Sequence, residues 1–177
     1  MAKLETATFA GGCFWCTEAV FRMIKGVGTA TSGYSGGEML SPTYEQVSGG
    51  KTGHKEAVQI TFDPQIVSYQ ELLNIFWQAH DPTQSDGQGA DIGSQYKAAI
   101  FYHDETQKEL AEKSKKNMKE EGAVTTEIIP YQNFFKAEEH HQKYFAKNPH
   151  APYCRIVIAP KVGKVEKLFP EKLKKEK

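Results

Sequence analysis

Residues 5–24, ETATFAGGCFWCTEAVFRMI, contain the feature on which the fold prediction depends. The first six residues are typical of a short strand, and two glycines follow at its end. The last eight residues have the pattern of a helix, which a Gly-Val-Gly segment closes. The stretch therefore predicts a strand that runs through two glycines into a helix, with Cys13 and Cys16 at the junction.

Strand and helix patterns interleave along the rest of the chain. A helix at 68–80 is the clearest, because Ser68 and Glu71 have the spacing of a capping box and apolar residues line one stripe. Asp104 is placed to cap the next helix. The remaining predicted elements are strands at 54–63, 96–103, 123–129 and 153–159 and helices at 105–121 and 136–148. This alternation is compatible with a parallel α/β sheet and with an α+β sandwich.

The length and charge of the chain restrict its architecture and its partners. No repeat or linker divides the 177 residues, so we expect a single domain at 1–177 with a charged, solvated and frayed tail at 160–177. The 22 basic and 22 acidic residues give zero net charge, which argues against a nucleic-acid binder. Balanced charge offers no argument for an oligomer, and we expect a monomer.

The expected compartment follows from the apolar segments and the cysteines. The first ten residues lack the apolar region of a secretory signal peptide, and no apolar run approaches the roughly 18 residues that span a membrane. Three cysteines, an odd number, fit poorly with a secreted disulfide framework. We therefore expect a cytoplasmic protein whose paired cysteines do chemistry.

Cys13 is the candidate nucleophile, because it follows a strand and two glycines and opens a helix. The free N–H groups and the positive dipole end of a helix N-terminus favour an anion. We therefore expect the Cys13 thiol to be more acidic than a free cysteine. The alternative is a buried structural cysteine, which leaves the glycines and the second thiol unexplained.

Cys16 lies three residues further on, so the two sulfurs share one helix face and lie within reach of a disulfide. A Cys-x-x-Cys pair in a cytosolic chain indicates redox chemistry or half of a metal site. The only further candidate ligands are the adjacent His140 and His141 and the lone Cys154, which is ordinarily a buried, inert residue. Zinc is therefore the weaker interpretation, and we expect no metal or cofactor.

Phe14 and Trp15 separate the two cysteines. They either pack in the core or wall the thiol against water. In the second case they form a pocket that holds a small apolar group next to the sulfur.

Glu56 shares the strand phase of the large apolar residues at 54–63, so its side chain is predicted to face the apolar side. Burial raises the pKa of a carboxyl, which lets it donate a proton near neutral pH. The alternative is a strand-end residue that turns to solvent and pairs with Lys51 or Lys55.

Tyr44 and Tyr96 lie in or beside glycine-rich loops, where a hydroxyl can reach a ligand, although each alone is more often a packing residue. Asp91 lies in the long glycine-rich stretch at 81–95, where its ordinary role is to form a turn. His141 carries only a weak signal by itself.

Four segments together resemble the methionine sulfoxide reductase A family. They are GGCFWCTE at 11–18, PTYEQVSGGKTGHKEAV at 42–58, FWQAHDPTQSDGQGADIGSQYKAAI at 76–100 and NPHAPYC at 148–154. The resemblance covers nearly the whole chain. It implies an α+β two-layer sandwich with a ferredoxin-like core, in which helices pack on a mixed sheet and long loops surround the active site.

The resemblance also implies an activity, the reduction of the S-epimer of methionine sulfoxide, free or in proteins. Cys13 matches the nucleophile that attacks the sulfoxide sulfur and becomes a sulfenic acid, and Glu56 matches the acid that protonates the oxygen. The other matching residues are Tyr44 and Tyr96, which hydrogen-bond the oxygen, Phe14 and Trp15, which hold the methyl group, and Asp91 and His141, which orient the substrate backbone.

In this family a second thiol converts the sulfenic acid to a disulfide, which thioredoxin then reduces, so the implied role is protein repair under oxidative stress. Some members resolve at the position of Cys16, and others at that of Cys154 in a glycine-rich C-terminal segment. Here PYCRIVIAPK is apolar and strand-like, which favours Cys16. Cys154, directly or in a relay, is the alternative.

Three other functions remain open on the sequence alone. A general dithiol-disulfide oxidoreductase needs only Cys13 and Cys16. The aromatic residues and tyrosine loops are also compatible with a non-catalytic binder of methionine-containing peptides. The third is a zinc-bound interaction module.

Overall fold

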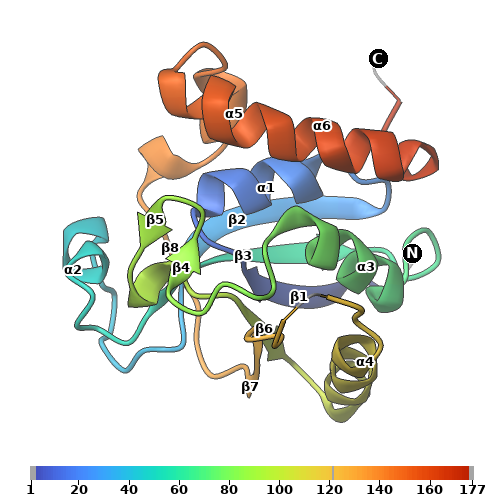
Figure 1. The fold of residues 1–177 in the computed structure, drawn as a ribbon, viewed down its shortest axis with the longest axis horizontal. Helices are drawn as coiled ribbons and strands as arrows, with labels where there is room; N and C mark the ends of the chain where they lie inside the picture. The colour runs from blue at the N-terminus through green and yellow to red at the C-terminus, as the bar shows by residue number, and fades with distance from the viewer. Residues whose placement is uncertain (1–2, 121, 176–177) are drawn as a thin grey trace.

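The computed structural model describes residues 3–120 and 122–175, which form one six-stranded sheet, a two-stranded sheet and several helices (Figure 1). The large sheet has the order β7-β6-β1-β3-β2-β8, and its neighbouring strands are antiparallel except for the parallel pair β6 and β7. The strands are β1 (Glu5–Ala10), β2 (Val27–Ser35), β3 (Lys55–Phe62), β6 (Ala99–Tyr102), β7 (Glu127–Pro130) and β8 (Phe135–Lys136). The prediction of an α+β fold with a mixed sheet is confirmed.

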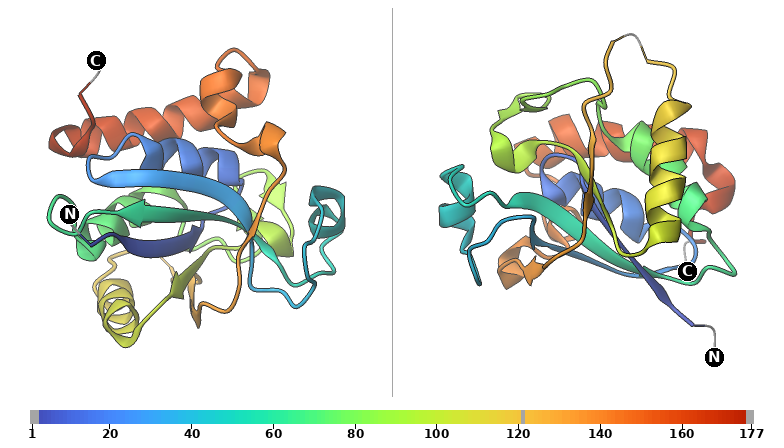
Figure 2. Two further views of the ribbon diagram at one scale, coloured as in Figure 1. Left: turned by 180° about the vertical axis from the view of Figure 1, so that it is seen from behind. Right: turned by 90° about the horizontal axis from the view of Figure 1, so that it is seen from below.

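Helices cover one face of this sheet and pack on one another (Figure 2). They are α1 (Phe14–Arg22), α3 (Tyr69–Ala79), α4 (Glu105–Lys116) and α6 (Ala159–Leu168). The core lies between sheet and helices: Phe9 of β1 stacks on Phe21 of α1 and on Phe76 of α3, with ring centroids 5.2 and 4.8 Å apart. α6 lies against α1 and α3. Within the described residues, no helix is long and apolar enough to span a membrane.

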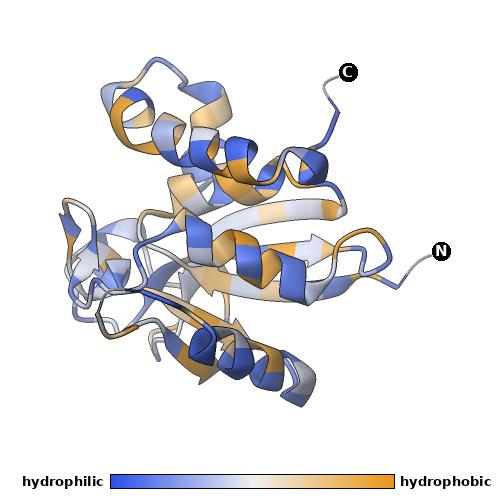
Figure 3. Ribbon diagram, turned by 45° about the vertical axis from the view of Figure 1, so that its right-hand side comes forward, coloured by the Kyte–Doolittle hydropathy of each residue, from blue (hydrophilic) through white to orange (hydrophobic). Residues whose placement is uncertain are grey.

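Local hydrogen bonds start two of these helices at the predicted positions. At α3, the Ser68 Oγ accepts from the Glu71 N–H at 3.1 Å, and a Glu71 carboxylate oxygen accepts from the Ser68 N–H at 2.8 Å. Asp104 caps α4 by accepting from the Gln107 N–H at 2.8 Å. Figure 3 shows hydrophobic residues along the strands and α3, whereas α4 is mainly hydrophilic.

The loops at one end of the sheet contain short elements of their own. They are α2 (Tyr44–Ser48), the antiparallel strands β4 (Gly87–Gln88) and β5 (Asp91–Ile92), and the 3₁₀ turn Ser94–Tyr96. These elements bring Tyr44, Asp91 and Tyr96 to the end of the sheet from which α1 begins (Figure 1).

The predicted strand at 153–159 is wrong, because these residues are helical. Cys154–Ile158 form a π-helical turn that continues directly into α6. Cys154, Ile158 and Val165 are fully buried and line one side of the helix, whereas Ile156 is 72% exposed. The apolar run therefore packs as a helical stripe instead of an alternating strand.

The expectation of a frayed tail is wrong for the part of 160–177 that the structure describes. Val165 of α6 is buried in the main core, and Leu173 forms an antiparallel bridge with Ile24. Lys172 pairs with Glu71 at the start of α3. Residues 176 and 177 of the predicted tail lie outside the described residues.

The predicted continuous helix at 136–148 is also wrong. The chain forms β8, a 3₁₀ turn at Glu139–His141 and the short helix α5 (Tyr144–Lys147). Lys143, between the last two, has left-handed backbone angles with φ 56° and ψ 34°, which no continuous right-handed helix contains. The predicted helix at 105–121 ends at Lys116, and residue 121 lies outside the described residues.

Candidate active site

Cys13 lies where β1 passes through two glycines into α1, as predicted. Gly12 has φ 88°, and a Cβ at this position would lie 2.7 Å from the Cβ of Gln88, so only glycine fits. Cys13 is the N-terminal capping residue of α1, and it is 8% exposed. The tight turn thus places the Cys13 sulfur at the helix start with little access to solvent.

The acidity of the two motif thiols differs from the sequence-based expectation. Burial raises the pKa of Cys13 well above its usual value, and the hydrogen bond that its thiol donates to Cys16 acts in the same direction. That hydrogen bond, helped by the positive charge of Lys161, lowers the pKa of Cys16 to about 7 against the effect of burial. At Cys13, burial therefore opposes the effect of the helix N-terminus on which the prediction of an acidic thiol depends.

Glu56 faces inward from β3. Its side chain is 3% exposed, and its Oε2 atom is buried with no hydrogen-bond partner among residues 3–120 and 122–175. Burial raises the pKa of this carboxyl well above its usual value, and the negative charges of Asp91 and Cys16 add to the effect. The predicted inward phase is confirmed, and the alternative of a solvent-facing side chain is wrong.

Tyr44 and Tyr96 approach Glu56 from two different loops. Burial raises the pKa of both phenols, and the nearby charge of Glu56 is the next largest cause. Cys13 is also close enough to affect the pKa of both phenols. Both phenols therefore stay protonated at neutral pH and can donate hydrogen bonds next to Glu56 and Cys13.

Phe14 and Trp15 differ in their surroundings. Phe14 is 1% exposed and packs in the main core, with its ring centroid 5.8 Å from that of Tyr34. Trp15 is half-buried next to the cysteines, and it stacks on Tyr144 with centroids 3.6 Å apart and planes 7° apart. Phe14 therefore matches the alternative of core packing, and Trp15 matches the alternative of an aromatic side chain beside the thiols.

His141 connects Trp15 with Tyr44. The Trp15 Nε1–H donates to His141 Nδ1 at 3.2 Å, so the neutral imidazole carries its proton on Nε2. Burial lowers the pKa of His141, with the charge of His140 as the next cause, and this favours the neutral ring at pH 7. In the described part of the chain, the buried Nε2 atom has no partner. It is a donor available to a ligand beside Tyr44, whose ring centroid lies 4.6 Å away.

Tyr153 is a site residue that the sequence analysis missed. Its hydroxyl donates to Asp91 Oδ2 at 2.7 Å and lies 3.9 Å from the Cys16 Sγ. It therefore links the loop that carries Asp91 to the thiol pair. The sequence feature that could have identified it is its position directly before Cys154 in NPHAPYC. The predicted strand at 153–159, however, did not indicate that the Tyr153 side chain faces the site.

Glu138 was also missed. It accepts the Tyr34 hydroxyl at 2.9 Å with Oε1 and the Tyr44 backbone N–H at 3.1 Å with Oε2. Through these contacts it fixes the start of α2 and hence the position of Tyr44. The sequence offered no signal, because Glu138 stands in a charged stretch that resembles a solvated helix face.

Cys154 packs in the same apolar cluster as Cys13 and Cys16, and all three are free thiols. It is fully buried, and burial raises its pKa, with the charge of Cys16 as a further cause. Its helical position corrects the predicted strand position, whereas the expectation of a buried cysteine is confirmed.

Comparisons with known proteins agree on one family. The model "Peptide methionine sulfoxide reductase" matches residues 5–173. Peptide methionine sulfoxide reductase MsrA of Sulfolobus acidocaldarius is 51% identical over 96% of this chain and 97% of its own. The enzyme of the same name from Nautilia profundicola is 53% identical over 97% and 99%.

Solved structures of similar proteins have the same fold. Mxr1 of Saccharomyces cerevisiae in reduced form superposes with a TM-score of 0.79, at 34% identity over 86% of this chain and 90% of its own. Methionine sulfoxide reductase A of Corynebacterium diphtheriae gives 0.77, at 34% identity over 85% and 78%. A further structure of Mxr1, in complex with Trx2, gives 0.55 at 26% identity over 80% and 85%.

Proposed function

Because this chain belongs to the peptide methionine sulfoxide reductase family, we propose that it reduces the S-epimer of methionine sulfoxide, free or in proteins, with Cys13 as the nucleophile. The observation that carries the proposal is the neutral, buried Glu56 carboxyl among Tyr44, Tyr96 and Cys13. A sulfoxide oxygen leaves sulfur only when it is protonated, and this arrangement supplies acidic protons next to a thiol.

The proposed first step transfers one oxygen atom. The Cys13 sulfur loses its proton and attacks the sulfoxide sulfur, while Glu56 protonates the oxygen and Tyr44 and Tyr96 donate hydrogen bonds to it. The hydroxyl then passes to the Cys13 sulfur as the S–S bond to the substrate and the substrate S–O bond break. The substrate sulfur is reduced by two electrons to methionine, and the Cys13 thiol is oxidised to a sulfenic acid. Phe14 and Trp15 hold the methyl group, while Asp91 and His141 orient the substrate backbone.

We propose that Cys16 resolves the sulfenic acid. It lies in the same apolar cluster as Cys13, and its pKa is lowered to about 7. An S–S bond forms between the two sulfurs and water leaves. Thioredoxin then reduces the disulfide by thiol exchange, and the complex of the similar Mxr1 with Trx2 supports this choice of reductant. Cys154, buried behind the pair, is the alternative resolver.

The experiment that tests the function uses resolved epimers with dithiothreitol as reductant. We expect turnover of the S-epimer and none after Cys13→Ser. Turnover of the R-epimer alone, or undiminished turnover by Cys13→Ser, contradicts the proposal. We further propose that 1–177 is one catalytic domain that acts as a monomer in the cytoplasm, and light scattering of the same preparation tests the monomer by its mass in solution.

A further inference from the structure

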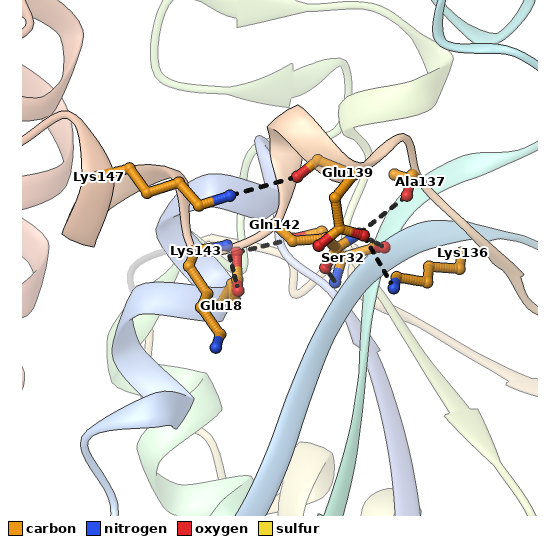
Figure 4. Close-up of polar contacts among 8 residues, drawn as sticks. All are labelled: Glu18, Ser32, Lys136, Ala137, Glu139, Gln142, Lys143 and Lys147. Carbon is orange, nitrogen blue, oxygen red and sulfur yellow. Dashed lines mark hydrogen bonds and ion pairs between the residues drawn. The ribbon is translucent and has the colours of Figure 1, made fainter.

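Residues 138–143 form a strap between α1 and the edge of β2, and Figure 4 shows the side chains that hold it. On the sheet side, the Gln142 side chain makes the backbone hydrogen bonds that a neighbouring strand would make with β2. The Ser32 N–H donates to Gln142 Oε1 at 3.0 Å, and Gln142 Nε2 donates to the carbonyl oxygens of Ser32 at 2.8 Å and Ala137 at 3.0 Å. The strap is therefore anchored to β2 immediately after His141.

On the helix side, Glu18 of α1 holds the strap (Figure 4). Its side chain is 1% exposed. Its Oε1 accepts the backbone N–H of Lys143 at 2.8 Å, and its Oε2 accepts the Ser32 hydroxyl at 3.1 Å. A buried carboxylate with a hydrogen-bond donor at each oxygen is held in one position, unlike a carboxylate on the surface.

The Lys143 N–H that Glu18 accepts belongs to the left-handed residue of the strap, with φ 56°. A side-chain-bearing residue rarely adopts this conformation, so it needs support from its surroundings. The turn directs the chain into α5, where Tyr144 stacks on Trp15 at 3.6 Å. Two residues before the turn, His141 accepts from the Trp15 Nε1–H. Trp15 is thus held by residues on either side of the Glu18 contact.

We propose that Glu18 is a positioning residue for Trp15. By fixing the left-handed turn at Lys143, it keeps His141 and Tyr144 against the indole and so sets the shape of the pocket that takes the methyl group of the substrate. The proposal rests on the proposed function, which gives Trp15 this role. Glu18 acts through the strap, so its loss weakens substrate binding and has little effect on the chemical step.

The test compares Glu18→Ala with Glu18→Gln. Glutamine can keep both contacts, because its oxygen accepts from the Lys143 N–H and its NH₂ donates to the Ser32 hydroxyl, so its KM for the sulfoxide stays within about twofold. Alanine loses a charge-assisted hydrogen bond, which raises KM about tenfold with kcat within about threefold. If Glu18→Ala does not fold, Glu18→Asp replaces it, since a shorter acid cannot reach both donors.

A second-site variant separates positioning from general stabilisation. Glycine adopts left-handed angles without strain, so Lys143→Gly in the Glu18→Ala background should lower the raised KM most of the way to the wild-type value. Lys147→Gly, in the right-handed α5, is the matched control and should leave the raised KM unchanged. Failure of Lys143→Gly to restore KM, or equal restoration by Lys147→Gly, overturns the proposal.

Fluorescence follows the indole without any assay of activity. In a Trp77→Phe background Trp15 is the only tryptophan, and acrylamide should quench it more in Glu18→Ala than in Glu18→Gln. Equal quenching overturns the positioning role. Because this measurement needs no substrate, it tests the strap even if the wild-type protein reduces neither epimer, a result that would refute the proposed function alone.

Discussion

Glu56→Gln replaces a buried acid with a neutral amide of nearly the same shape. In the wild-type protein the Glu56 carboxyl is kept neutral by burial, and its Oε2 has no partner among the described residues, so its proton is available to an incoming oxygen. A positioned general acid accelerates a reaction about 10²–10⁴-fold. We therefore expect the rate of sulfenic acid formation to fall about 10³-fold, equivalent to about 4 kcal/mol of activation free energy.

Although Glu56→Gln lowers the rate, it should raise the free energy of unfolding at alkaline pH. Because the folded pKa of Glu56 is raised above its unfolded value, its contribution to stability is complete below the unfolded pKa and is lost as pH rises through the folded pKa. Glutamine does not ionise. Glu56→Gln should therefore match wild type at acidic pH and exceed its stability at alkaline pH. The wild-type rate should fall over the same rise in pH, because Glu56 loses the proton that it donates. The rate of the variant should not change with pH for this reason.

Single-turnover mixing with the S-epimer, without reductant and with methionine quantified after quenching, measures the rate, and urea unfolding at several pH values measures stability. Glu109→Gln, at an exposed carboxyl on α4, is the matched control and should change neither quantity. Equal single-turnover rates for Glu56→Gln and wild type would refute the role of Glu56. So would a parallel fall of rate and stability, which indicates a structural role.

Four further substitutions test other parts of the structure. After one turnover, Cys16→Ser should hold Cys13 as a sulfenic acid whereas Cys154→Ser still forms a disulfide, and thiol counting that finds the reverse reassigns the resolver. Val165→Ala removes two methyl groups from a fully buried position of α6 and should lower the free energy of unfolding by about 1–3 kcal/mol in urea; a change under about 0.5 kcal/mol means that α6 is peripheral to stability. Lys161→Met removes a positive charge that lowers the pKa of Cys16, so this pKa should rise from about 7, and an unchanged thiolate absorbance titration contradicts this.

The features that the sequence predicted correctly depend on residues close together in the chain. The caps at Ser68 and Asp104 need only the next three residues, and each is formed as expected. The turn before Cys13 needs only the glycines beside it. The inward direction of Glu56 follows from strand parity, a rule that holds wherever one face of a strand is buried.

The features that the sequence did not predict depend on distant residues. The break at Lys143 is held by Glu18, 125 positions earlier, and the Tyr153 hydroxyl meets Asp91, 62 positions away. The error at 153–159 has another cause. A short apolar run rich in β-branched residues fits a strand or a helix, and the buried Val165, which shows the helical spacing, lies within the segment assigned to the tail.

The pKa of Cys13 shows how the relative size of two effects decides the chemistry. A helix N-terminus stabilises a charge by about 0.3–1 kcal/mol. Full burial in an apolar environment shifts a pKa by as much as 3–5 pH units, or about 4–7 kcal/mol. Cys13 is only 8% exposed, so the effect of burial on its pKa outweighs that of the helix terminus. At Cys16, in contrast, the hydrogen bond from Cys13 and the positive charge of Lys161 lower the pKa. In the proposed reaction, Cys16 is therefore placed to accept the proton of Cys13 as Cys13 attacks the sulfoxide.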